Sequence, residues 1–240
     1  MAIKEEIYIL THKTGGIINK NKNLMEHVSE STITDKLINA ARYGTPMIEL
    51  GSNSPKVILT AGVHGNELPP QIASLWLIED LIDKKLNGTV YVIPFAIPNA
   101  TMKNSRRFKG FDMNRSASKN GSATNKILNA TDKFGITSLA DFHATKPRSN
   151  PGIESVFCSK KPCPESLKIA EHITDATSSK VICHRIAGAM YSGALEDECN
   201  LKFTAAVTCE VVSENNNVRY GSIERSYLQM ESYLKYFNIL

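Results

Sequence analysis

VILTAG at residues 57–62 and YVIPF at residues 91–95 are apolar at successive positions instead of alternating ones. Strands with this pattern are buried on both faces, as in parallel or mixed sheets covered by helices. β-rich runs and helix-period segments alternate along the chain, with runs at 56–61, 89–95, 138–142, 181–186 and 205–212 and helical segments near 71–83, 164–175 and 222–237. The pattern predicts an α/β fold of three layers, α/β/α, with a mostly parallel or mixed central sheet.

The length and composition are typical of one globular domain. The chain has 240 residues, of which 42% are hydrophobic and 22% charged. No internal repeat, low-complexity tract or linker-like change of composition divides it. We therefore expect a single domain over residues 1–240, with residues 1–45, which include a helical stretch near 34–41, as an N-terminal extension packed on it.

Nothing in the sequence indicates export, a membrane or a nucleic-acid partner. The start, MAIKEEIYIL, has acidic residues where a signal peptide needs a basic segment. No stretch approaches the apolar length of a transmembrane helix, and the net charge of +4 is small and dispersed. We expect a cytoplasmic protein that binds neither membrane nor nucleic acid.

His64 and Glu67 stand in AGVHGNE at residues 61–67, directly after the apolar run at 56–61. They therefore emerge at the carboxyl end of a strand, where open α/β sheets place their ligand sites. Two histidines and one carboxylate are a pattern of catalytic zinc sites that keep a coordination position for water. This pattern requires a second histidine.

His143 meets that requirement. It follows the apolar run at 138–142, so it stands at a second strand end and can meet His64 above one edge of the sheet. The sequence thus predicts one Zn²⁺ per chain, held by His64, Glu67 and His143. Asp141 is placed either to orient the His143 imidazole, as metal-bound histidines commonly need, or to pack locally. The remaining histidines are expected to be structural or exposed: His12, His27, His172 and His184.

Glu210 interrupts AAVTCEVV at residues 205–212, an otherwise nearly continuous apolar strand. Burying an unpaired carboxylate there is costly. A zinc-activated water needs a carboxylate that is not a ligand to move its proton, so we predict that Glu210 is the general base. The alternative is a glutamate at a frayed strand edge, paired with a surface lysine. The five cysteines, none of them in a C-x-x-C pair, are expected to be free thiols.

Residues 97–122 are rich in Asn, Ser, Lys, Arg and Gly and lack an apolar period, which predicts a long loop. The loop carries a basic cluster, formed by Lys103, Arg106, Arg107, Lys109 and Arg115. Taken alone, such a cluster is typical of a solvated loop.

These motifs together resemble a known group of enzymes. The chain is similar to zinc carboxypeptidases of the carboxypeptidase A type, and to the succinylglutamate desuccinylase and aspartoacylase deacylases that share their fold. The resemblance follows the chain order and spans most of residues 56–212. It is carried by AGVHGNE at 61–67, IPNA at 97–100, Arg107 followed by FDMNR at 111–115, DFHA at 141–144 and TCEV at 208–211.

The resemblance implies roles for the basic loop. Arg107 would polarise the scissile carbonyl and stabilise the oxyanion, while Asn114 and Arg115 would grip a substrate carboxylate. A guanidinium beside an amide donor suits bidentate carboxylate binding. Arg106 adjoins Arg107, but the family spacing to the Asn-Arg pair selects Arg107. Tyr191 stands two positions from the place of the family's mobile tyrosine, so substrate binding and packing are both open to it.

The expected activity is zinc-dependent hydrolysis of an amide bond next to a substrate carboxylate. We expect a metallocarboxypeptidase acting on a small peptide, with an N-acyl amino acid deacylase of the succinylglutamate desuccinylase/aspartoacylase type as the alternative. The wording around His64 is closer to the deacylases, yet those generally carry a further β domain, and the residues from 222 onwards predict a helix. Two rivals without hydrolysis are a zinc-containing peptide-binding module and nucleic-acid binding through residues 103–115.

Overall fold

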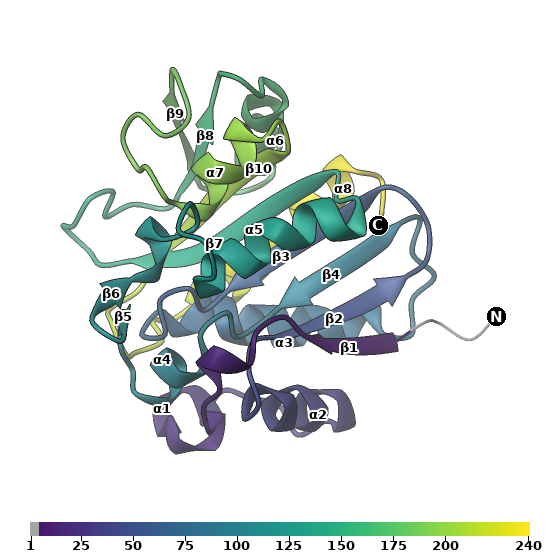
Figure 1. Ribbon diagram of the computed structural model, residues 1–240, viewed down its shortest axis with the longest axis vertical. Helices are drawn as coiled ribbons and strands as arrows, with labels where there is room; N and C mark the ends of the chain where they lie inside the picture. Colours follow the sequence, from purple (N-terminus) through teal and green to yellow (C-terminus); the bar gives the residue numbers. More distant parts are fainter. Residues whose placement is uncertain (1–4) are drawn as a thin grey trace.

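The computed structural model describes residues 5–240, and an eight-stranded mixed sheet forms its centre (Figure 1). Four neighbouring strands, in the order β4, β3, β7 and β10, are parallel, and the pairs β1/β2, β2/β4 and β10/β8 are antiparallel. β8 and β9 are parallel to each other. Across the sheet the strands are β1 (Glu5–Ile9), β2 (Pro46–Gly51), β4 (Thr89–Ile93), β3 (Lys56–Ala61), β7 (Ser138–Thr145), β10 (Ala205–Val212), β8 (Ser155–Ser159) and β9 (Lys180–His184).

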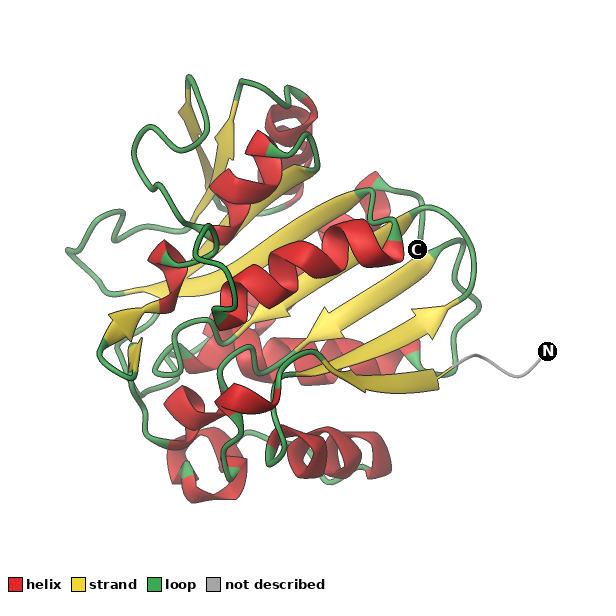
Figure 2. Ribbon diagram, viewed as in Figure 1, coloured by secondary structure: helices red, strands yellow, loops and turns green. Residues whose placement is uncertain are grey.

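Helices cover both faces of this sheet, as Figure 2 shows. α3 (Leu68–Leu81), α6 (Glu165–Ala176) and α8 (Ser222–Tyr236) pack together on one face. α5 (Ala123–Phe134) and α7 (Leu195–Leu201) cover the other. Each face has its own buried apolar cluster, which explains why strands such as β3 and β4 are apolar at successive positions. The predicted three-layer α/β/α fold with a mixed sheet is confirmed.

The amino-terminal part, expected as a packed extension, contributes to the sheet itself. β1 pairs antiparallel with β2 and forms one edge. α2 (Thr32–Ala41) follows an N-cap at Ser31, whose hydroxyl accepts the Thr34 N–H, and packs against α3. Three further short helices lie in this part of the chain: η1 (His12–Thr14), η2 (Ile18–Lys20) and α1 (Lys22–Met25).

The segment 97–122, predicted as a long loop, contains short regular elements. These are α4 (Pro98–Met102), the two-stranded hairpin β5 (Arg107–Phe108) and β6 (Phe111–Asp112), and η3 (Met113–Arg115). The hairpin has only two residues in each strand, too few for an apolar period to be visible in the sequence. The prediction of an irregular connection was therefore wrong in part.

The structure also describes the state of the cysteines and the apolar character of the helices. The five cysteines form no disulfide, and Cys158, Cys199 and Cys209 are buried. Within residues 5–240, no helix combines the length and the apolar character needed to cross a membrane.

The loop between β3 and α3 carries His64 and Glu67, and Gly65 fixes its position. A Cβ atom at Gly65 would lie 2.0 Å from the carbonyl carbon of Ala100 and 2.1 Å from the amide nitrogen of Thr101. The Gly65 N–H also donates to the Ser105 carbonyl. The absence of a side chain thus lets the loop lie directly against α4, since backbone atoms cannot move aside as a side chain can.

We expect Gly65→Ala to lower the free energy of unfolding by about 2 kcal/mol or more, because two backbone segments must separate. Gly135→Ala is the matched control. Gly135 has a left-handed φ of 64° but no atom within 4 Å of a Cβ, so it isolates the conformational cost of about 1–2 kcal/mol. Denaturant unfolding of the metal-free variants measures both. An equal or smaller loss for Gly65→Ala would show that the loop does not depend on this contact.

Candidate active site

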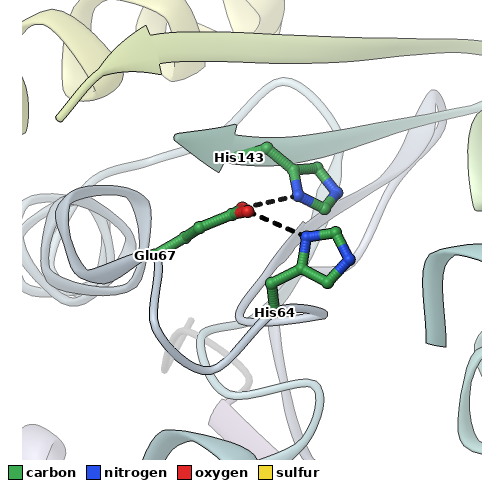
Figure 3. Close-up of side chains that lie close together, drawn as sticks. All are labelled: His64, Glu67 and His143. Atoms are coloured by element: carbon green, nitrogen blue, oxygen red, sulfur yellow. Dashed lines mark hydrogen bonds and ion pairs between the residues drawn. The ribbon is translucent and has the colours of Figure 1, made fainter. Parts of the chain in front are cut away.

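Glu67 is the centre of a buried cluster at the carboxyl ends of β3 and β7. Its Oε1 lies 2.9 Å from His64 Nδ1, and its Oε2 lies 2.7 Å from His143 Nδ1 (Figure 3). The three side chains are 2–5% exposed. Their donor atoms all lie within 4.8 Å of one another, and they are the one such group found among the described residues. The structure thus brings together the three residues predicted as zinc ligands.

Both imidazoles are held in the orientation that a metal ligand needs. His143 Nε2 lies 2.9 Å from Asp141 Oδ2, and His64 Nε2 lies 2.9 Å from Asp112 Oδ1. With a metal bound, each Nε2–H would donate to its carboxylate and the Nδ1 lone pair would be free for the metal; without one, a proton on Nδ1 joins each ring to Glu67. A carboxylate behind each ligating histidine is the usual arrangement around protein-bound zinc. The donor set and its supports fit a zinc ion.

The electrostatics of the cluster also favour a cation. Burial opposes ionisation of Glu67, but the facing rings of His64 and His143 outweigh it and hold the Glu67 pKa below its usual range. Burial likewise opposes a charge on His143, yet Asp141 and Glu67 raise its pKa well above the usual value. The negative charge that would keep a proton on this imidazole would equally stabilise a bound metal ion.

Glu210 lies opposite His143 in the parallel pair β7/β10, so their side chains share one face of the sheet. It lines a cavity of about 330 Å³ together with His64 and Glu67. Its Oε2 is buried without a hydrogen-bond partner among the described residues. Burial raises its pKa to about 8. This arrangement differs from the alternative of a carboxylate paired with a surface lysine.

Asn114, Arg115 and Tyr191 line the same cavity. The Asn114 Oδ1 accepts the Leu195 N–H at 3.3 Å, which ties η3 to the start of α7. The Arg115 guanidinium lies 5.0 Å from the centre of the Tyr191 ring. That ring also contacts Phe157 edge to face at 5.7 Å. Tyr191 therefore both packs and faces the cavity.

Of the two adjacent arginines, Arg106 faces the cluster. Its Nη1 donates to Glu67 Oε1 at 3.0 Å, its Nε lies 3.6 Å from Asp112 Oδ2, and it lines the cavity. Arg107 is exposed, donates to the Gly110 carbonyl and is not among the lining residues. The family spacing selects Arg107 to stabilise the oxyanion, whereas in the structure Arg106 is the arginine that lies beside Glu67 and lines the cavity.

Asp112 is a site residue that sequence reasoning missed. Burial opposes its ionisation, but the hydrogen bond to His64 and the nearby Arg106 hold its pKa below the usual range. Asp141 stands two positions before the histidine that it contacts, His143. Asp112 instead contacts His64, which lies 48 positions away in the sequence, so only the folded chain shows this contact.

The fold is carboxypeptidase-like and matches that of several solved structures. A succinylglutamate desuccinylase/aspartoacylase from Rhodobacter sphaeroides superposes with a TM-score of 0.61 at 18% identity, covering 84% of this chain and 62% of that one. The product-bound cell shape determinant protein Csd4 from Helicobacter pylori gives 0.67 at 18% identity, covering 82% and 56%. The product-bound ectoine utilization protein EutE (DoeB) from Ruegeria pomeroyi gives 0.65 at 16% identity, covering 83% and 63%.

Residues 53–211 match the model of the succinylglutamate desuccinylase/aspartoacylase catalytic domain, so the chain belongs to this family of hydrolases. The suspected relationship is thereby confirmed. No curated protein matches the sequence. The chain spans less than two thirds of the length of the solved relatives described above.

We expect Asp141→Asn and Asp112→Asn each to weaken zinc binding about 10- to 100-fold, because the supporting hydrogen bond sets the tautomer and basicity of the imidazole. Competition with a chromophoric chelator measures the affinity. Asp132→Asn is the control, since this exposed carboxylate pairs with Lys202 away from the site. Unchanged affinity in both test variants would mean that the carboxylates do not support metal ligands.

Proposed function

We propose that this protein is a zinc-dependent amidohydrolase that removes the acyl group from an N-acyl amino acid. The observation that carries the proposal is the cluster of His64, Glu67 and His143, two members of which, His64 and Glu67, line the same cavity as Glu210. The family match supports a deacylase more than the metallocarboxypeptidase expected from the sequence. The family's name refers to enzymes acting on N-acylated acidic amino acids.

His64 Nδ1, His143 Nδ1 and the Glu67 carboxylate would hold the metal. Bound zinc supplies Lewis acidity, which activates water near neutral pH. Glu210 would take the proton from the attacking water at its unpaired carboxylate oxygen and pass it to the leaving amine. Burial raises its pKa, which favours donation to the amine, while the positive charge of a bound zinc ion would favour the ionised form that accepts the first proton.

Three side chains, one amide and two guanidinium groups, would then act on the substrate. Asn114 and Arg115 would hold the carboxylate of the amino acid, and Arg106 would stabilise the oxyanion that develops on the scissile carbonyl. Arg107 remains the residue that family resemblance selects for this last role. Because the two arginines are adjacent in the chain, alanine variants of each can be compared directly.

Glu210→Gln should retain zinc and lose hydrolysis by about 10²- to 10⁴-fold in kcat, since it removes the proton carrier. His143→Ala should lose both zinc and hydrolysis. Zinc content is measured by atomic absorption and hydrolysis by release of free amine from a panel of N-acyl amino acids. Glu171→Gln, an exposed carboxylate on α6, is the control. Retained turnover in Glu210→Gln would refute the role given to Glu210.

Arg106→Ala should lower kcat by about 10²- to 10³-fold if it stabilises the oxyanion, with a smaller effect on KM. Arg107→Ala should leave kcat within a few-fold of the parent, since its guanidinium binds a loop carbonyl. The reverse result would assign the oxyanion to Arg107. Steady-state kinetics of the two zinc-loaded variants on one acyl substrate decide between them.

Peptide hydrolysis is a second candidate function. A tripeptide-bound Csd4 structure from Helicobacter pylori superposes with a TM-score of 0.66 over 82% of this chain. Short peptides with a free carboxylate present the same amide and anion to Asn114 and Arg115. Adding them to the acyl amino acid panel separates the two activities, and zinc-dependent binding of either class without turnover would instead support a binding module.

A further inference from the structure

Two adjacent buried carboxylates lie near the start of α7, and one of them lines the cavity. Glu196 is 4% exposed and lines the cavity, and Asp197 beside it is 2% exposed. Both lie in the first turn of α7. None of the described ion pairs includes either carboxylate, although the desolvation of a charged group is costly without a partner.

The hydrogen bonds described for Glu196 all reach one of its two carboxylate oxygens, Oε1. Ser159 Oγ lies 3.5 Å from Glu196 Oε1 and 3.5 Å from Asp197 Oδ1, but a hydroxyl has one proton to donate. Asn200 Nδ2 donates to Glu196 Oε1 at 2.7 Å and also to the Ala206 carbonyl. Burial, and then the charge of Asp197, raise the Glu196 pKa well above its usual value. A cation bound beside Glu196 would lower this pKa and stabilise the ionised carboxylate.

A second polar group faces the same space. Thr208 on β10 lines the cavity, is only 9% exposed, and its hydroxyl has no hydrogen-bond partner among the described residues. Its position in the register is opposite Phe157 of β8. An unpartnered hydroxyl at the cavity wall is an acceptor available to a ligand's N–H group.

The rest of this wall is apolar and close to the carboxylate-binding residues. Phe157, Tyr191 and Ala194 line it. The Leu195 N–H, one residue before Glu196, donates to Asn114 Oδ1. The residue whose carboxylate Asn114 and Arg115 hold would therefore direct its side chain along the aromatic wall towards Glu196.

From this placement we infer that the site selects an amino-acid residue with a cationic side chain, an alkyl ammonium or guanidinium that pairs with Glu196 beside Thr208. This inference rests on the proposed function for the orientation of the substrate. The alkyl stem would pack on Phe157 and Tyr191, as the stems of lysine and arginine do on apolar surfaces. An acidic side chain would bring a further carboxylate against Glu196 and Asp197 and is disfavoured.

The test is binding of free amino acids, which are products of the proposed reaction, to the zinc-loaded protein by titration calorimetry. Lysine is compared with norleucine, and arginine with citrulline, since each pair differs mainly by the charge. Lysine and arginine should bind about tenfold or more tightly than their neutral counterparts. This comparison needs no variant.

Glu196→Gln should reduce both ratios to about one, and Asp197→Asn, which removes the neighbouring charge outside the cavity lining, should keep most of the preference. Melting temperature and zinc content verify that each variant is folded. Equal binding of the neutral and charged ligands, tighter binding of glutamate, absence of any amino-acid binding, or an unchanged ratio in folded Glu196→Gln would overturn the inference.

Hydrolysis of Nα-acetyl-lysine, Nα-acetyl-norleucine and Nα-acetyl-glutamate separates this inference from the proposed function. A lysine preference in binding without hydrolysis of any acyl substrate or peptide refutes the hydrolase and leaves the Glu196 subsite standing. Hydrolysis that is fastest for acetyl-glutamate or acetyl-norleucine refutes the subsite and leaves the hydrolase standing.

Discussion

The buried carboxylate of Glu67 is the interaction on which the site depends. A carboxylate that is 4% exposed is tolerated only with charged or hydrogen-bonding partners. Its two oxygens receive four: His64 and Arg106 at Oε1, and His143 and the Ala144 N–H at Oε2. These partners come from the β3–α3 loop, the segment before β5 and the end of β7, so one side chain fixes three parts of the chain relative to one another.

The sheet order makes this convergence possible. β3, β7 and β10 are adjacent and parallel, so their carboxyl ends lie along one edge. In this register Ala61 is opposite Phe142, and Glu210 is opposite His143. The predicted metal ligands and the predicted base thus lie close together at the ends of neighbouring strands, and no long loop has to be ordered to bring them there.

The sequence predicts those parts of the fold and the site that depend on residues close together in the chain. Apolar runs in the sequence indicate β3, β7 and β10. His64, His143 and Glu210 stand within or directly after these runs, where a polar side chain is costly unless it has a partner or a function. The choice between Arg106 and Arg107 is not local in this sense. Consecutive residues of an extended segment point to opposite sides, so only one of the two faces the cluster, and only the packed hairpin shows which.

The burial of the start of α7 could not be predicted from the sequence for a related reason. LEDECNL reads as an exposed acidic turn, yet Glu196 and Asp197 are buried against β8 and β10. Their burial follows from the segment before them. A Cβ at Gly193 would lie 2.7 Å from the Arg115 carbonyl, and the Gly193 carbonyl accepts the Ala117 N–H, which places this turn directly on η3.

This contact joins two groups of residues that lie far apart in the sequence. η3 carries Asn114 and Arg115, and the turn it contacts leads within three residues to Glu196. The Leu195 N–H bond to Asn114 makes the connection direct. A shift of α7 would therefore move Asn114 and Arg115 together with Glu196. Because both positions are set by one packed contact, that contact also sets the spacing between carboxylate and side-chain charge that the proposed substrate must match.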